Sequence, residues 1–355
     1  MDDWFHFPSK TPAVEHWSTP ENAVGPRNWL YLVAALVFAM VVVGGATRLT
    51  ESGLSITQWK PVTGVIPPLS AAEWAAAFEE YKKIPQFTEL FPDMDLEGFK
   101  VIYAWEWTHR LLGRLVGLVF AGGFAWFWIK DRLPAGLKPK LFGILALGAL
   151  QGFVGWWMVK SGLEARVTVA PERLATHLGL ALLLYMALIW TAWEALAGEG
   201  RASLPSRWRP IAIGLLLLVY VQCLLGALVA GNQAGLVYND WPLMNGRFLP
   251  QAYWSAGARS LLHSQAAVQF DHRIVAYLLF AAAIGAGIGA ARSRRLGART
   301  RWLFAGLAGL VSLQALLGVA TLMARAPLGL SAAHQAMAAI VLAAATTLAW
   351  QARRQ

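Results

Sequence analysis

The chain has 355 residues, of which 57% are hydrophobic and only 14% are charged. An ordinary soluble domain carries about a quarter charged residues, so this composition excludes that class. The apolar residues lie in long continuous runs, and not in the alternating segments of about ten residues that build membrane β-barrels. We therefore expect an all-α polytopic membrane protein.

The net charge of +10 suggests nucleic-acid binding, but Lys and Arg also collect in the cytoplasmic loops of membrane proteins. The second explanation fits the apolar composition, so we expect a lipid bilayer as the surroundings and no nucleic acid. The single cysteine, Cys223, lies inside an apolar run. An intramolecular disulfide and a cysteine-based metal site are therefore excluded.

Eight apolar runs reach the length of about 20 residues that a bilayer requires. They cover residues 28–46, 105–128, 139–160, 172–195, 208–230, 266–290, 300–323 and 330–350. The stretch 47–104 is too polar to span, is rich in proline, and contains an amphipathic piece from Ala71 to Tyr81. We expect it to form a structured loop outside the membrane. The acidic, polar N-terminus resembles neither a secretory signal nor a transit peptide, so the first span should remain as an anchor.

Basic residues predict the orientation, because they are enriched in cytoplasmic loops. They follow the second, fourth, sixth and eighth spans: Lys130, Arg132, Lys138, Lys140, Arg201, Arg207, Arg209, Arg292, Arg294, Arg295, Arg299, Arg301, Arg353 and Arg354. The loops on the opposite side have fewer. Both termini should be cytoplasmic, with the loops 47–104 and 231–265 on the other side.

An internal repeat relates the two parts of the chain. The recurring elements are His109-Arg110 as His272-Arg273, Gln151-x-x-x-Gly155 as Gln314-x-x-x-Gly318, and His177 as His334. Four spans return the chain to its starting side, so the two copies share one orientation, as in some transporters. We predict two pseudo-symmetric four-helix bundles, with residues 28–200 in the first half and 201–355 in the second. Residues 1–27 form a cytoplasmic N-terminal segment.

Four histidines, His109, His177, His272 and His334, lie near the outer ends of four spans. An ionisable group at such a depth is costly and points to function. His109 and His177 should lie at similar depth in the first bundle, and the other two in the second. Paired imidazoles across a helical bundle suit axial ligation of haem iron. A helix–helix hydrogen bond and a proton path are the alternatives, whereas zinc is disfavoured because no third ligand is close in sequence.

Small residues and arginines accompany these histidines. The small residues are Gly113, Gly117, Gly179, Ala333, Ala336 and Ala338. They would leave room for a flat macrocycle, or serve helix packing. Arg110, Arg114 and Arg273 lie near the outer boundary, where they could pair with haem propionates or reach lipid phosphates.

Glu106 precedes His109 by three residues and so lies on the same helix face. One interpretation is structural: a charge near a helix start, or a partner for a following arginine. The other is functional: a base or an electrostatic stabiliser beside a haem substrate. The second copy has Gln269 at this position. We expect a structural device to survive in both copies, so the loss of the carboxylate favours the functional interpretation.

Longer motifs extend these observations along nearly the whole chain. They are GGATRLTESGLS at 44–55, WKPVTG at 59–64, EWTHR at 106–110, YNDWPLMNG at 238–246 and VQFDHR at 268–273. With these motifs the chain resembles haem A synthase, the membrane enzyme that converts haem O to haem A for cytochrome oxidase. It is most similar to the branch shared by mitochondria and alphaproteobacteria, since the paired outer-loop cysteines of the Gram-positive branch are absent. The stretch 261–265 departs from the family pattern, and we assign His263 no role.

The resemblance implies oxidation of the C8 methyl group of haem O to a formyl group by successive hydroxylations. The first half would bind the substrate haem, with His109 and His177 at its iron and Glu106 beside the chemistry. The second half would hold a resident haem b, ligated by His272 and His334, for electron transfer. The resemblance also implies the bacterial cytoplasmic (inner) membrane as location. Haem O synthase and oxidase assembly factors are the expected partners, and a homo-oligomer is one candidate assembly.

Two other functions use the same histidines. A di-haem b-type cytochrome that exchanges electrons with quinol would need all four histidines but not Glu106. A haem transporter or chaperone would account for the repeat and would require an alternating-access cavity.

Overall fold

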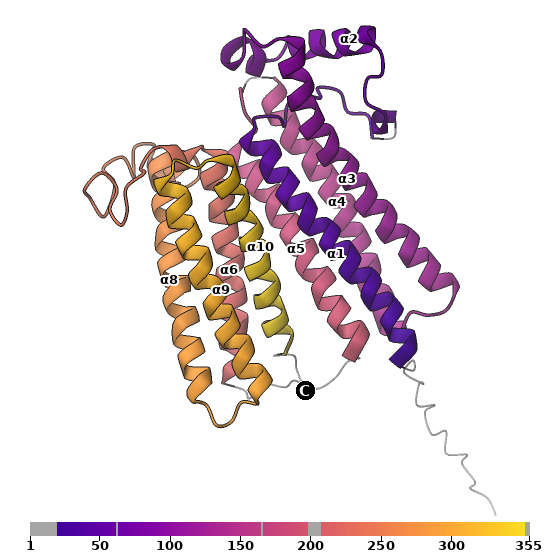
Figure 1. Cartoon of the computed structure of the whole chain (residues 1–355), viewed down its shortest axis with the longest axis vertical. Coiled ribbons are helices and arrows are strands. Elements are labelled where there is room, and N and C mark those ends of the chain that lie inside the picture. Colours follow the sequence, from indigo (N-terminus) through magenta and orange to yellow (C-terminus); the bar gives the residue numbers. More distant parts are fainter. Residues whose placement is uncertain (1–19, 62, 165, 198–206, 352–355) are drawn as a thin grey trace, which may run out of the picture.

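The computed structural model describes residues 20–61, 63–164, 166–197 and 207–351, which are largely helical (Figure 1). Eight helices are long and apolar enough to cross a membrane. They are α1 (Pro20–Leu49), α3 (Leu96–Ile129), α4 (Lys138–Leu163), α5 (Pro171–Ala197), α6 (Trp208–Gly231), α8 (Gln265–Arg292), α9 (Ala298–Met323) and α10 (Leu328–Gln351). The prediction of an all-α protein with eight spans is confirmed. Most of the predicted N-terminal segment, and the boundary between the halves at residues 200 and 201, lie outside the described residues.

The helix α3 begins nine residues before the apolar run that predicted it. Asp95 caps its N-terminus by accepting a hydrogen bond from the Gly98 N–H at 2.8 Å. The added turns are amphipathic, and they bury Phe99 and Ile102. The apolar run marks only the part of α3 that suits a bilayer, so hydropathy could not locate the true helix start.

The predicted loop outside the membrane contains α2 (Ala71–Tyr81), and short helical turns at Thr63–Val65 and Gln86–Leu90. Ser70 and Glu73 form a capping box at the start of α2. The apolar side of α2 packs on the N-terminal turns of α3. Together they form a small core that is separate from the core of the membrane bundle. Its buried members are Leu54, Phe78, Tyr81, Ile84, Phe99, Ile102 and Val169. The prediction of a structured loop is therefore confirmed.

The spanning helices form two groups, which we call the first half (α1, α3, α4 and α5) and the second half (α6, α8, α9 and α10) (Figure 1). The beginning of α1 and the end of α10 lie at one end of the molecule, and the long loops lie at the other. This agrees with a repeat in which four spans return the chain to its starting side.

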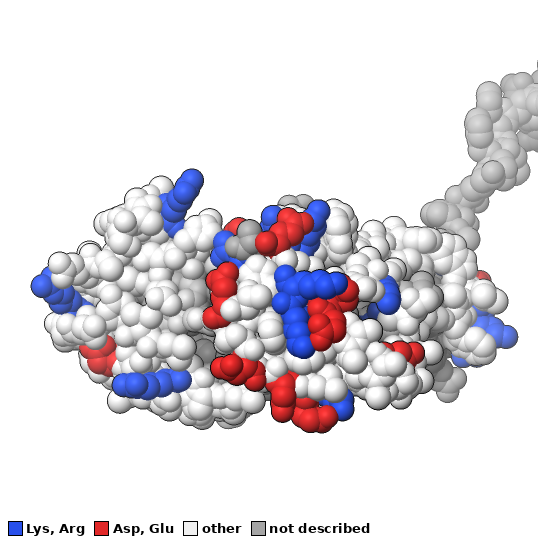
Figure 2. Space-filling model, turned by 90° about the horizontal axis from the view of Figure 1, so that it is seen from above, with Lys and Arg blue, Asp and Glu red and all other residues white. Residues whose placement is uncertain are grey.

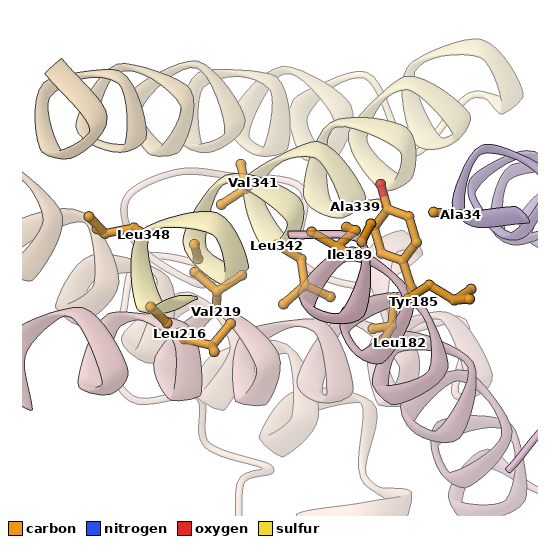
Figure 3. Close-up of a cluster of buried hydrophobic side chains, with 14 of the residues drawn as sticks. Ala34, Leu182, Tyr185, Ile189, Leu216, Val219, Ala339, Val341, Leu342 and Leu348 are labelled. Carbon is orange, nitrogen blue, oxygen red and sulfur yellow. The ribbon is translucent and has the colours of Figure 1, made fainter. Parts of the chain in front are cut away.

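The halves join where α1 and α5 pack against α6 and α10. Figure 3 shows part of this junction, where Leu182, Tyr185 and Ile189 of α5 approach Leu342 of α10 and Val219 of α6. In the most apolar window of α1 and of α5, 44% of the residues are buried, against 6% in α4. The first half therefore places α4 at the edge of the molecule.

The two bundles differ in one helix–helix contact. The helix α8 packs along α9, but the equivalent α3 and α4 touch at few positions. A β-carbon added to Gly287 on α8 would lie 3.1 Å from the Ala308 Cβ of α9, so the backbones are close there. The first half has Phe124 in place of Gly287, and its ring meets Phe142 of α4 edge to face at 5.0 Å. Two aromatic rings thus separate helices that a glycine lets approach in the second half.

The end that carries the long loops shows acidic and basic side chains close together (Figure 2). Several form ion pairs one turn apart, such as Lys82 with Glu79 at 2.7 Å and Lys83 with Glu80 at 2.6 Å. Exposed pairs of this kind contribute little to stability. Positive and negative side chains are therefore mixed on this face, which does not form the continuous positive surface that would attract a polyanion.

Candidate functional site

The imidazoles of His272 on α8 and His334 on α10 lie near each other in the second half. Their ring centroids are 6.5 Å apart, and the ring planes meet at 80°. Each ring lies against a glycine of the neighbouring helix. A β-carbon added to Gly226 on α6 would lie 3.3 Å from Cε1 of His272, and one added to Gly318 on α9 would lie 2.8 Å from Cε1 of His334. The two glycines therefore provide the space that the rings occupy.

The first half repeats the contacts between histidine and glycine. A β-carbon on Gly44 of α1 would lie 2.8 Å from Cε1 of His109 on α3. One on Gly155 of α4 would lie 2.9 Å from Cε1 of His177 on α5. Gly155 precedes Gly318 by 163 residues, as His109 precedes His272, and Gly44 precedes Gly226 by 182 residues, as Gly53 precedes Gly235. All four predicted histidines thus lie in equivalent settings, each beside a glycine.

Glu106 on α3 is only 3% exposed, and both its carboxylate oxygens accept hydrogen bonds. The Ser55 hydroxyl and the Ile56 N–H donate to Oε2, each at 2.7 Å. Arg110 donates to Oε1 from Nη2 at 2.6 Å and from Nε at 3.1 Å. Arg110 also donates to the carbonyls of Ile56 and Gln58. Glu106 and Arg110 together hold residues 55–58, in the loop between α1 and α3 that we call the first outer loop, against α3.

The second half contains the same contact with an amide in place of the carboxylate. Arg273 donates to Gln269 Oε1 at 3.2 Å, and to the carbonyls of Tyr238 at 2.8 Å and Asp240 at 3.0 Å. Those two loop residues are equivalent to the two whose carbonyls Arg110 contacts. Gln269 Nε2 also donates to the Tyr238 carbonyl at 3.2 Å. A structural device has therefore survived in both copies, and the change from Glu to Gln by itself does not argue against a structural role.

The arginines bind main-chain carbonyls of the outer loops, which the sequence did not suggest. Arg114 donates to the carbonyls of Pro61 and Lys60, both at 2.9 Å. Arg273 is only 8% exposed and also donates to the Leu243 carbonyl at 3.0 Å. Contacts between distant segments of this kind leave no signal in hydropathy or spacing.

The small residues named from the sequence have different surroundings. The Met40 methyl group packs against Gly113, and Gly179 lies against Leu224 and Tyr220 of α6. Gly179 thus serves helix packing between the halves, and a β-carbon on Gly117 would meet no atom within 4 Å. The glycines that contact the histidines were missed, although the repeated Gln-x-x-x-Gly motif contained two of them.

Tyr253 links the second outer loop to α8. Its hydroxyl donates to Asp271 Oδ1 at 2.8 Å, one residue before His272. Burial raises the pKa of Tyr253 to about 12, and the neighbouring Asp271 acts in the same direction. The phenol therefore remains a hydrogen-bond donor at neutral pH and fixes the loop to the start of α8.

His263, to which the sequence assigned no role, lies near one acidic side chain. His263, at the end of α7 (Ser260–His263), lies 3.9 Å from Glu172 of α5, with both side chains partly exposed. Within the part of the chain that the structure describes, no three or more His, Cys, Asp or Glu side chains are grouped so that they could hold a metal ion.

The paired histidines and their repeated surroundings can be set beside known proteins. Residues 27–346 match a family described as cytochrome oxidase assembly protein. The chain belongs to this family. A member named heme A synthase from Caulobacter sp. (strain K31) is 59% identical over 327 residues, which are 92% of this chain and 95% of that protein. Members of the same name from Caulobacter vibrioides and Rhodopseudomonas palustris (strain HaA2) are 57% and 50% identical, over 92% and 91% of this chain and 95% and 89% of their own.

Membership of the family confirms the resemblance found in the sequence motifs. Family members align from α1 to α10, so both halves belong to the shared architecture. The eight apolar helices make this member a multi-pass membrane protein.

Proposed function

We propose that this protein makes haem A for cytochrome oxidase by oxidising the C8 methyl group of haem O to a formyl group. The high identity to proteins named heme A synthase supports this function. The single observation that carries the assignment to residues is the buried charge of Glu106, three residues before His109. In the second copy Gln269 makes the equivalent loop contact with an amide, so the contact alone does not require a carboxylate. The first half is therefore the substrate half, and residues 201–355 form the half with a resident haem b.

The residues of the second half fit a haem held by two histidines. The two imidazoles project from different helices and their ring centroids lie 6.5 Å apart, so both would be available to hold one haem between the helices. The Nδ1 atom of His334 is buried and has no hydrogen-bond partner among the described residues. His272 and His334 would hold the haem b, which would supply electron transfer.

In the first half, His109 and His177 bind and orient the substrate haem O. Both lie against glycines as their counterparts do, and Nδ1 of His109 is likewise buried without a partner among the described residues. Glu106 lies one turn before His109. Because both its oxygens already accept hydrogen bonds, we assign it electrostatic stabilisation of the reacting group in preference to proton abstraction. Arg110 fixes the carboxylate in place.

The remaining predictions concern the cellular setting. Both termini lie on the cytoplasmic side of the bacterial inner membrane, and the outer loops on the opposite side, because the short loops rich in Lys and Arg follow even-numbered spans. Haem O synthase delivers the substrate, and oxidase assembly factors accept the product.

The experiment that tests this function uses the two halves as controls for each other. The full chain is co-expressed with a haem O source, and the extracted haems are identified by chromatography. The wild type should yield haem A. Glu106→Gln should accumulate haem O or a hydroxylated haem, since Gln269 shows that an amide can hold the loop.

Gln269→Glu in the second half is the matched control, and it should still yield haem A. If the wild type contains haem b alone and Glu106→Gln changes nothing, the protein is a b-type cytochrome and the synthase assignment is wrong.

A further inference from the structure

Three of the four histidines contact a glutamine of the neighbouring helix. Gln151 Nε2 donates to the main-chain carbonyl of His177 at 3.0 Å and lies 3.2 Å from its Nδ1. Gln222 Nε2 donates to the His272 carbonyl at 3.0 Å and lies 3.0 Å from its Nδ1. The third contact joins Gln314 Nε2 to the His334 carbonyl, again at 3.0 Å. We call these the glutamine contacts.

Each glutamine precedes by four residues the glycine that lies against the same histidine. A spacing of four places both on one helix face, so the glycine makes room for the ring and the glutamine holds the turn that carries it. The Oε1 atom of each of the three glutamines is buried and has no partner among the described residues. The glutamine atom next to each ring is the donor Nε2, so the contact that positions each histidine is the hydrogen bond to its main-chain carbonyl.

The fourth histidine, His109, is the exception. Its glycine is Gly44, and four residues earlier stands Met40, at the position equivalent to Gln222. The Met40 side chain packs against Gly113, one turn beyond His109 on α3. A thioether has no N–H to donate and is flexible, so Met40 cannot make the hydrogen bond to a histidine carbonyl that the three glutamines make. The pair α1 and α3 therefore lacks the glutamine contact that the other three helix pairs have.

We propose that Gln151, Gln222 and Gln314 are positioning residues for haem ligation, and that Met40 makes His109 the exchangeable ligand. The inference rests on the proposed function. A half that keeps its haem has both histidines supported by glutamines. A half that must admit haem O and release haem A in every cycle has one supported ligand, His177, and one unsupported ligand, His109.

The test exchanges the two side chains between the halves. Full-length protein in detergent is loaded with haem, and loss of haem to an excess of apomyoglobin is followed over time. The haem type that remains, b or O and A, identifies the half. Met40→Gln should slow the loss of haem O and A about tenfold, and Gln222→Met should speed the loss of haem b about tenfold, in line with the effect of outer-shell partners of metal ligands.

Spin state provides a readout that general loosening of the fold would not reproduce. In optical and electron paramagnetic resonance spectra, Met40→Gln should increase the low-spin fraction of the first-half haem. Met40→Leu keeps the apolar volume without an amide and should match the wild type. A gain of low-spin haem in Met40→Gln cannot come from a failure to fold.

The outcomes separate this inference from the proposed function. If His177→Ala and His334→Ala leave the haem content unchanged, the proposed ligands are wrong. If each removes haem from its own half, but Met40→Gln and Gln222→Met change neither the rates nor the spin states, the haem sites stand and the role of the glutamines is wrong.

Discussion

The two halves of this protein share one frame and differ at a few positions within it. In both, a glycine lies against each histidine, and an arginine on the helix of the first histidine binds the outer loop. The differences between equivalent positions are Glu106 and Gln269, Met40 and Gln222, and Phe124 and Gly287. The first pair changes the charge near the first histidine of each half. The second pair changes whether a glutamine contacts that histidine, and the third changes the distance between its helix and the next one. The two halves thus share their frame and differ in the side chains that surround the histidines.

The largest effect should come from removing the arginine in each half. Arg110→Ala leaves the buried Glu106 carboxylate without its cation, and loss of one member of a buried ion pair costs about 3–5 kcal/mol. Arg273 donates its hydrogen bonds to neutral acceptors, and Arg273→Ala should cost about 1–3 kcal/mol. Thermal unfolding in detergent should therefore show a larger loss of Tm for Arg110→Ala.

A second substitution tests whether charge explains that difference. Glu106→Gln combined with Arg110→Ala should recover much of the lost Tm, because the remaining buried group is then neutral. Equal losses for Arg110→Ala and Arg273→Ala, with no recovery in the double variant, would show that the ion pair adds nothing beyond the contacts of the second half.

A middle-sized effect should follow from the different packing of α8 on α9 and of α3 on α4. Gly287→Leu would press a side chain onto Ala308 and should cost about 1–3 kcal/mol through overpacking. Gly148→Leu on α4 is the matched control, because a β-carbon there meets nothing within 4 Å. Its stability should equal that of the wild type or rise slightly.

The same two variants should differ in haem b content, measured from the extracted haems. Gly287→Leu should lower it and Gly148→Leu should not. If Gly287→Leu is as stable as Gly148→Leu, the close approach of α8 and α9 does not distinguish the halves.

The smallest effect concerns the outer loops, since the first loop contains α2 with its capping box. The N–H groups of Leu69 and Ser70 donate to the Glu73 carboxylate and lower the pKa of Glu73. A carboxyl whose pKa is lower in the folded state stabilises that state above its unfolded pKa of about 4.3. The contribution is lost as the pH falls through the folded value.

Acidification should therefore loosen α2, measured by hydrogen exchange of residues 71–81 between pH 6 and pH 3. Glu73→Gln retains a capping side chain without its titration, so its exchange in α2 should depend less on pH than that of the wild type. An identical pH profile in both proteins would mean that another group controls the loop.

Individual residues show which parts of the fold and of the site the sequence alone predicts. Apolar runs predicted every spanning helix, and the motif repeat predicted two bundles. Depth in the spans, the repeat and spacing predicted the four histidines and Glu106 as site residues, which stays a prediction. The start of α3 at Leu96 was missed, because its first turns are amphipathic and are buried only by packing on α2. The loop contacts of Arg110 and Arg273 were missed because their partners lie 52 to 54 and 30 to 35 residues away along the chain.

The sequence by itself determined the class of the molecule, its eight spans and its repeat, and it predicted the residues to which we assign the chemistry. These follow from local hydropathy and from motifs, which act over one helix or less. Only the tertiary structure decided which glycine lies behind each histidine, which three histidines contact a glutamine, and where α3 and α4 separate. Such features arise between helices, where one missing side chain or one aromatic ring sets the distance between two backbones, and no single segment encodes that distance.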